Sequence, residues 1–150
     1  MPQTLKEFAA RSDAIVCGRV IDVADVSDPR TRTARTEYEV RVTKTVKEHP
    51  NLGTRATVCR PIGKIEYDDR VVKQYEPHFP EFSVGAEYLL FLTWDARGGG
   101  CFAPAFGPLS TAEIDSKGAV HPFVSHPLFA GLTGRGKEEV LNKIAIAMGK

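Results

Sequence analysis

Three cysteines and four histidines are the side chains with which this 150-residue chain could carry out nucleophilic or metal chemistry. The histidines lack metal-ligand spacing, because no His-Glu-x-x-His occurs and His121 and His126 stand in a stretch interrupted by prolines. Each of these two precedes a proline, which favours an extended backbone and disfavours a shared ion. We therefore expect no metal site; if one existed, its ligands would be His121 and His126, with Cys101 as a third.

The cysteines permit two interpretations that depend on the redox state of the compartment. Cys17 and Cys59 lie in expected strands, where a small buried thiol is common, whereas Cys101 follows three glycines and should be more accessible. In a reducing compartment all three would be thiols. In an oxidising one, the first pairing to expect is Cys59 with Cys101, with Cys17 left buried, although sequence alone does not decide the connectivity.

An enzyme is an alternative only through Cys101 acting with a histidine, since such partners meet in space rather than in sequence. The nucleophile motif Gly-x-Ser-x-Gly is absent, as are Gly-x-Gly-x-x-Gly and the complete phosphate-binding Gly-x-x-x-x-Gly-Lys-Ser/Thr. The segment 131–136 is rich in glycine but follows no expected strand, so we interpret it as a linker. We expect a non-catalytic protein without a cofactor.

The composition is that of one globular domain over residues 1–150. Hydrophobic residues make up 42% and charged residues 26%, and 20 Lys and Arg against 19 Asp and Glu leave a net charge of +1. Such a balance argues against disorder and against nucleic-acid binding by bulk charge. The longest strongly apolar run, residues 88–92, is too short to cross a membrane.

The pattern of elements predicts a mainly β fold. Residues 13–23 and 87–94 are almost continuously apolar, as in strands buried on both faces, whereas residues 36–47 alternate apolar and polar side chains. A Thr4-x-x-Glu7 capping box starts a short helix, and an apolar stripe marks an amphipathic helix at the other end. The expected elements are helix 4–11; strands 13–23, 36–47, 54–60, 64–73, 87–94, 101–106, 111–114 and 119–123; and helix 137–148.

These elements predict a small β-barrel or curled sheet with helices packed outside it. Residues 25–35 are expected to form a solvated loop, and residues 75–85 an ordered loop with aromatic side chains.

Local charge gives one binding signal. Basic residues gather between residues 30 and 47 around Glu37 and Glu39, and aromatic residues of the neighbouring strand and loop could stack on a ligand. Cross-strand ion pairing on a solvated face explains the same alternation without any ligand. The candidate contact surface is the face of strand 36–47 with the loop 74–84, and its candidate residues are Arg30, Arg32, Arg35, Arg41, Lys44, Tyr67, Tyr75, His78 and Phe79.

Three stretches carry a resemblance to a known family. They are Ser-Asp-Ala-Ile-Val-Cys-Gly-Arg-Val at 12–20, Glu-Tyr-Glu-Val-Arg-Val at 37–42 and Phe-Ser-Val-Gly-Ala-Glu-Tyr-Leu-Leu-Phe-Leu at 82–92. In order and spacing they resemble a group of poorly characterised bacterial exported proteins. Over residues 5–125 the chain is also similar to the oligonucleotide/oligosaccharide-binding barrel of tissue inhibitors of metalloproteinases and netrin modules. This resemblance implies a five- to six-stranded Greek-key barrel, here with a helix at each end.

The resemblance does not extend to the chemistry of those inhibitors. They insert an N-terminal cysteine into the protease, whereas the first cysteine here is Cys17, and their dense disulfide framework is missing. No functional residue can therefore be carried over.

We expect a non-catalytic binding or protein-interaction module that is periplasmic or secreted, with a protein or glycan as its partner. Binding of single-stranded nucleic acid or an oligosaccharide on the barrel face is the alternative. No secretory signal opens the chain, and an expected helix starts close to Met1, a pattern that fits both a start at Met1 and a leader removed before it.

Overall fold

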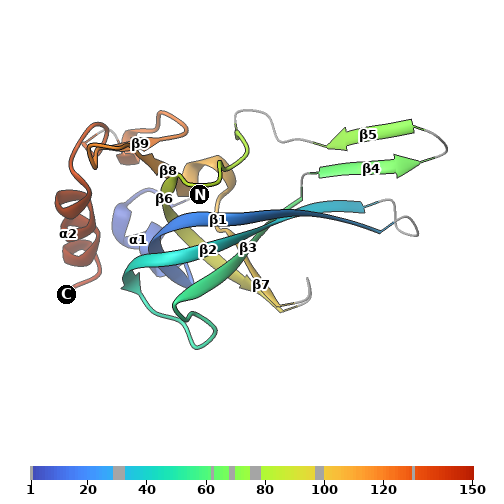
Figure 1. Cartoon of the computed structure of the whole chain (residues 1–150). Coiled ribbons are helices and arrows are strands. Elements are labelled where there is room, and N and C mark those ends of the chain that lie inside the picture. Colours follow the sequence, from blue (N-terminus) through green and yellow to red (C-terminus); the bar gives the residue numbers. More distant parts are fainter. Residues whose placement is uncertain are drawn as a thin grey trace.

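A seven-stranded sheet, antiparallel except for one strand pair and curled on itself, dominates the protein (Figure 1). The computed structural model describes residues 2–28, 33–61, 63–67, 70–74, 79–96, 100–129 and 131–150. In chain order the strands of this sheet are β1 (Ala14–Asp28), β2 (Thr33–Lys47), β3 (Arg55–Arg60), β6 (Glu87–Asp95), β7 (Cys101–Pro104), β8 (Thr111–Ile114) and β9 (Val120–Pro122).

Five of these strands close into a ring, which confirms the predicted barrel-like, mainly β fold. The order runs β1-β2-β3-β7-β6, and β6 pairs again with β1 from Glu87 to Leu92. Every pair in the ring is antiparallel except β3 with β7, which are parallel and share a single registered pair, Val58 with Phe102. The strands β8 and β9 continue the sheet outward from β6.

The central strands β1 and β6 are buried on both faces, as their continuous apolar sequence predicts. One face of each strand, including Val16 and Leu90, points into the barrel, where it meets Tyr38 and Phe102. The other face supplies a second core under the helices, with Ile15, Cys17, Leu89 and Phe91 among its members. Two separate apolar cores therefore share the same two strands.

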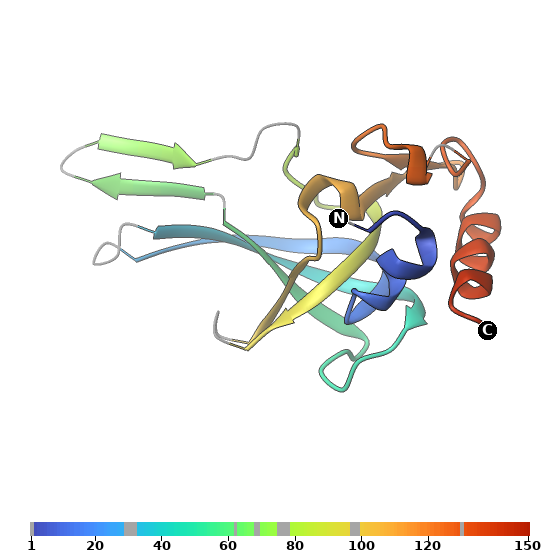
Figure 2. The ribbon, with the colours of Figure 1, turned by 180° about the vertical axis from the view of Figure 1, so that it is seen from behind.

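The two predicted helices cover this second core (Figure 2). They are α1 (Leu5–Ala10) and α2 (Lys137–Ala147), and the capping oxygen of Thr4 accepts a hydrogen bond from the Glu7 amide at 3.1 Å. The Glu7 carboxylate reaches the Gln3 amide, one residue before the position that a capping box predicts. No helix in the described part of the chain has the length and apolar character needed to cross a membrane.

The N-terminal helix α1 is held to β2 by a partly buried lysine. The ammonium of Lys47 donates to the carbonyl oxygens of Ala9 and Ser12, at 3.1 and 2.6 Å. A cation at the C-terminal end of a helix also interacts favourably with the helix dipole. The basic residue at the end of β2 therefore has a structural task and is not available to a ligand.

Two sequence predictions, one of a single strand and one of a loop, are wrong. The expected strand 64–73 is two strands, β4 (Gly63–Tyr67) and β5 (Arg70–Gln74), which pair with each other in antiparallel register. The expected loop 25–35 is largely strand: β1 runs on to Asp28, and β2 starts at Thr33. Backbone pairing between the two strands tolerates the polar side chains whose composition suggested a loop.

The extended parts of β1 and β2 and the hairpin β4–β5 lie at one end of the molecule. The far ends of β1 and β2 form a two-stranded ribbon that projects beyond the ring, and the hairpin β4–β5 lies beside it in both views (Figures 1 and 2). Two short 3-10 helices, Gly107–Ser110 and Pro127–Phe129, also stand where the sequence predicts only extended pieces and loops.

The C-terminal helix α2 is fixed by a partly buried ion pair. The carboxylate of Glu87 on β6 accepts hydrogen bonds from Lys137 at 2.6 Å and from the Thr43 hydroxyl at 2.7 Å. Burial alone would raise the pKa of Glu87, but these two hydrogen bonds outweigh it and hold the pKa below its usual range. The ionised carboxylate thus ties β6, β2 and the start of α2 together.

We predict that Gly18→Ala destabilises the protein by about 1–3 kcal/mol, because it overpacks the barrel. A Cβ there would overlap Cγ1 of Val40 and lie 3.2 Å from the carbonyl oxygen of Arg41. Urea unfolding measures the effect. The matched control is Gly53→Ala, whose new methyl group meets only an oxygen at 3.9 Å and should change stability by less than about 0.5 kcal/mol. Equal stability of the two variants would contradict the prediction.

We predict that the Glu87 contribution to stability is lost in acid. Because the folded pKa is depressed, the stabilisation is present above the unfolded pKa of about 4.3 and disappears as the pH falls through the folded value. Glu87→Gln should lower the free energy of unfolding by about 1–3 kcal/mol near neutral pH. In urea titrations at a series of pH values, this gap between variant and wild type should close below about pH 4. A gap independent of pH would contradict the assignment.

Candidate functional site

The outer face of β2 and β3 is the candidate site, because strand alternation points its polar side chains away from the barrel. Tyr38 and Val40 face the interior, while Glu37 and Glu39 lie on the opposite side. The backbone register places Glu37 beside Cys59 and Glu39 beside Thr57. The predicted alternation of strand 36–47 is therefore confirmed in its middle part.

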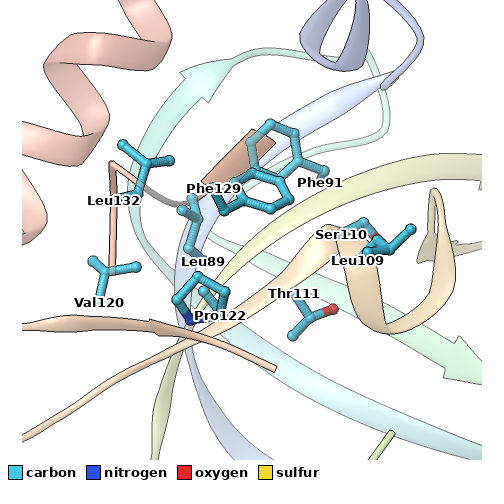
Figure 3. Close-up of a pocket in the computed structure, with 10 residues that line it drawn as sticks. Leu89, Phe91, Leu109, Ser110, Thr111, Val120, Pro122, Phe129 and Leu132 are labelled. Atoms are coloured by element: carbon cyan, nitrogen blue, oxygen red, sulfur yellow. The ribbon is translucent and has the colours of Figure 1, made fainter. Parts of the chain in front are cut away.

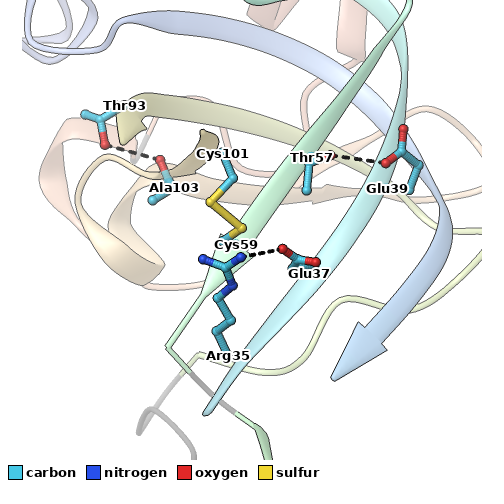
Figure 4. Close-up of a disulfide and its surroundings, with 8 residues drawn as sticks. All are labelled: Arg35, Glu37, Glu39, Thr57, Cys59, Thr93, Cys101 and Ala103. Atoms are coloured by element: carbon cyan, nitrogen blue, oxygen red, sulfur yellow. Dashed lines mark hydrogen bonds and ion pairs between the residues drawn. A yellow bond between two sulfur atoms is a disulfide. The ribbon is translucent and has the colours of Figure 1, made fainter. Parts of the chain in front are cut away.

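Most charges on this face have a partner within it (Figure 4). The Arg35 guanidinium meets the Glu37 carboxylate at 2.8 Å, and the Thr57 hydroxyl donates to Glu39 at 3.2 Å. The first pair lies along β2 and the second joins β3 to β2, so pairing on a solvated face, the interpretation that needs no ligand, explains these residues. Arg41 differs, since it stands exposed and faces another exposed arginine, Arg55, across the two strands.

The predicted basic residues divide into separate groups. Lys44 points toward α2, where its ammonium lies 3.7 Å from Glu138, and Lys47 is occupied at α1. Tyr67 lies in β4, beside Arg70 in the register. Arg30, Arg32, Tyr75 and His78 fall outside the described residues.

Phe79 was predicted as a contact residue, and this is wrong, because its side chain is only 4% exposed. Its ring stacks on the guanidinium of Arg60, with 3.4 Å between the ring centroid and Cζ. Arg60 also donates to the carbonyl oxygens of Phe79 and Pro80, at 2.7 and 2.6 Å. The described part of the aromatic loop, which starts at Phe79, is therefore held to the end of β3.

The sequence analysis missed Arg60, although the pattern of β3 contained the signal. Ala56, Val58 and Arg60 are alternate residues, so the strand period that turns Val58 inward also turns Arg60 inward. The positive charge of Arg60 lies near the Tyr38 hydroxyl group. Burial raises the pKa of Tyr38, while Arg60 and the Phe82 backbone oppose the rise, so this phenol stays neutral near pH 7.

A disulfide joins Cys59 on β3 to Cys101 on β7, the pair that the sequence analysis placed first (Figure 4). The two Cα atoms are 6.1 Å apart, within the usual range for a bridge. Cys17 is free and lies in the core, where burial raises the pKa of its thiol to about 12. Neither Cys101, whose sulfur is bonded, nor Cys17, which stays protonated, offers a thiolate nucleophile in this form.

The two candidate histidines have separate local tasks. The ring of His121 lies 2.8 Å from a carboxylate oxygen of Asp115, whose other oxygen accepts from the Lys117 and Ala119 amides and so shapes the β8–β9 turn. The hydrogen bond from His121 is the main cause that lowers the pKa of Asp115. His126 accepts from the Leu128 amide. Among the described residues, no group of three His, Cys, Asp or Glu side chains is arranged to hold a metal.

The glycine-rich segment before α2 does not form a phosphate cradle. The amides of Leu132, Gly134 and Lys137 donate to carbonyl oxygens of the protein, and the Lys137 ammonium is bound to Glu87. A phosphate site needs such amides free and pointing at the ligand. The segment instead docks α2 against the β8–β9 hairpin.

An apolar cavity lies between β6, β8 and the short helix Pro127–Phe129 (Figure 3). Phe91, Phe129 and Leu132 are among its lining residues, and its free volume is about 10 Å³. That space holds about one water molecule. The cavity is therefore a packing defect of the second core and no ligand site.

We predict that the disulfide contributes about 4 kcal/mol to stability, the loop-closure value for its separation of 42 residues. Cys59→Ala/Cys101→Ala, or added reductant, should lower the urea midpoint, and reductant should not affect the double variant. Cys17→Ala is the control that keeps the bridge and should respond to reductant as the wild type does. The unreduced, denatured protein should titrate as one thiol, and three thiols would contradict the bridge.

A comparison with models of known protein families matches none of them, and a comparison with curated proteins finds no match either. The role of the outer β2–β3 face is therefore inferred from its side chains and from the disulfide beside it.

Proposed function

We propose that this protein is a non-catalytic binding module that works outside the cytoplasm, in the periplasm or after secretion, and binds a protein or glycan. The observation that carries the proposal is the Cys59–Cys101 disulfide on the outer side of the barrel. Structural disulfides form and persist in oxidising compartments and are rare in the cytosol. A bridge that joins two ring strands is typical of structural bonds.

We also propose that the barrel is of the oligonucleotide/oligosaccharide-binding type. Counted along the chain, the ring strands follow the order first, second, third, fifth, fourth, and the third and fifth are parallel. This order supports the five-stranded Greek-key barrel of that fold, in which the second and third strands carry the ligand face. Here those strands are β2 and β3, the strands of the candidate site.

The charges of the face favour a protein or glycan over single-stranded nucleic acid. A nucleic-acid site needs unpaired cations along the strand and aromatic rings exposed for base stacking. Arg35 is bound to Glu37, and Phe79 is buried beneath Arg60. The exposed Arg41–Arg55 pair supplies two cations beside Glu39 and Thr57, a mixed polar surface that suits a polar partner.

Site-specific photo-crosslinking tests the face. A photoreactive amino acid replaces Arg41, and the protein is irradiated in the extracytoplasmic fraction of its native cells. The matched control carries the same group at Lys117, an exposed position in the β8–β9 turn. We expect a discrete adduct from position 41 and none from position 117. No adduct at 41, or equal adducts at both, would contradict the proposal.

A binding titration distinguishes the proposal from the nucleic-acid alternative. A fluorescent 20-nucleotide oligothymidylate is titrated with the protein at rising salt. We expect no salt-dependent binding. Tight binding at low salt that weakens steeply with salt, with the slope reduced by about one in Arg41→Ala, would replace our proposal with nucleic-acid binding.

A further inference from the structure

A groove at the C-terminal end of β2 is separate from the proposed face. It runs between the end of β2, at Lys44–Val46, and one side of α2, and it has a volume of about 510 Å³. That is within the range of about 300–1,000 Å³ found for ligand sites. Both views of the molecule show α2 beside this end of β2 (Figures 1 and 2).

The groove exposes a strand edge. In the register of the described chain, β3 pairs with β2 only as far as Arg41, and one further hydrogen bond joins the Val42 amide to Thr54. From Thr43 onward this edge of β2 has no strand partner among the described residues. The carbonyl oxygen of Val46 is turned into the groove, where the Lys150 ammonium donates to it at 2.9 Å. An open edge is a template for an added strand.

The side chains that line the groove specify what kind of strand would fit. Val46, Leu141 and Ala145 give it an apolar wall, whereas Lys44 and Lys150 place two cations along it. Alternate side chains of a bound strand would meet these two kinds of surface, because successive side chains point to opposite faces.

One acidic residue of the groove, Glu138, opposes these cations only weakly. It lies 3.7 Å from the Lys44 ammonium, and the two side chains are 77% and 52% exposed. Exposed pairs of this kind contribute little and exchange readily for another carboxylate. The groove therefore keeps a net positive charge that an acidic strand would complement.

We propose that an extended acidic peptide segment of a partner protein binds in this groove as an added strand on the edge of β2. Its main chain pairs with the edge and displaces the Lys150 ammonium from the Val46 carbonyl. Its carboxylates then contact Lys44 and Lys150, and its apolar side chains pack on α2. This inference goes beyond the proposed function, because it assigns a partner class to a second surface.

The test uses the full chain and a defined probe, a fluorescent hexapeptide Ac-Glu-Val-Glu-Val-Thr-Val-amide. One matched peptide has lysine at both glutamate positions. A second carries N-methyl groups on alternate residues, which removes main-chain donors without changing charge. We expect each matched peptide to bind at least tenfold more weakly. The largest amide chemical-shift changes on titration with the acidic peptide should fall at residues 43–46.

Protein variants give the second arm. Lys44→Glu/Lys150→Glu should weaken binding of the acidic peptide at least tenfold, whereas Lys117→Glu, an equal charge change in the β8–β9 turn, should not. Equal binding of the N-methylated peptide would overturn the proposal, as would shifts confined to other strands. Concentration-dependent dimers with the same shifts would also overturn it, because a second copy would then occupy the edge. Crosslinks from position 41 that persist when peptide binding fails would leave the proposed function standing.

Discussion

The contact between β3 and β7 is the constraint on which the rest of the structure depends, because it closes the ring. It is the weakest seam by backbone pairing, with one registered pair, Val58 with Phe102. Two further links reinforce it: the disulfide from Cys59 to Cys101 outside, and the apolar packing of Val58 and Phe102 inside. A covalent bond is thus located where hydrogen bonding contributes least. Without the contact between β3 and β7, the sheet would have two free edges at this position.

Closure also determines how the two surfaces of β2 differ. Over its first part β2 lies between two strands, so only its outward side chains meet solvent, and most of these form pairs such as Arg35–Glu37. Past Val42 this strand no longer pairs with β3. There the carbonyl oxygen of Val46 accepts a hydrogen bond from Lys150, which follows α2. One strand therefore offers a side-chain surface at one end and a hydrogen-bonding edge at the other. Both belong to one antiparallel ladder with β1, which three register shifts interrupt.

Local sequence pattern predicts the parts of this molecule in which burial follows the strand period. The apolar runs of β1 and β6 and the alternation of β2 are such cases, and both cysteines of the bridge lie at predicted strand positions. Local pattern does not predict burial where a contact between residues far apart in the sequence determines it. Phe79 is aromatic and lies in a loop, which suggests an exposed ring, but Arg60 from a different strand buries it. The polar ribbon of β1 and β2 is stabilised by its cross-strand pairing, which no local window shows.

Because β1 and β6 are buried on both faces, they couple the two cores when the protein unfolds. Val16 and Leu90 belong to the barrel core, while their neighbours Ile15 and Leu89 belong to the core beneath the helices. Neither core can lose its packing without exposing strands that the other requires. Partial unfolding of one layer is therefore costly, and the molecule behaves as one cooperative unit despite its two cores. Release of the helices would not leave an intact barrel behind.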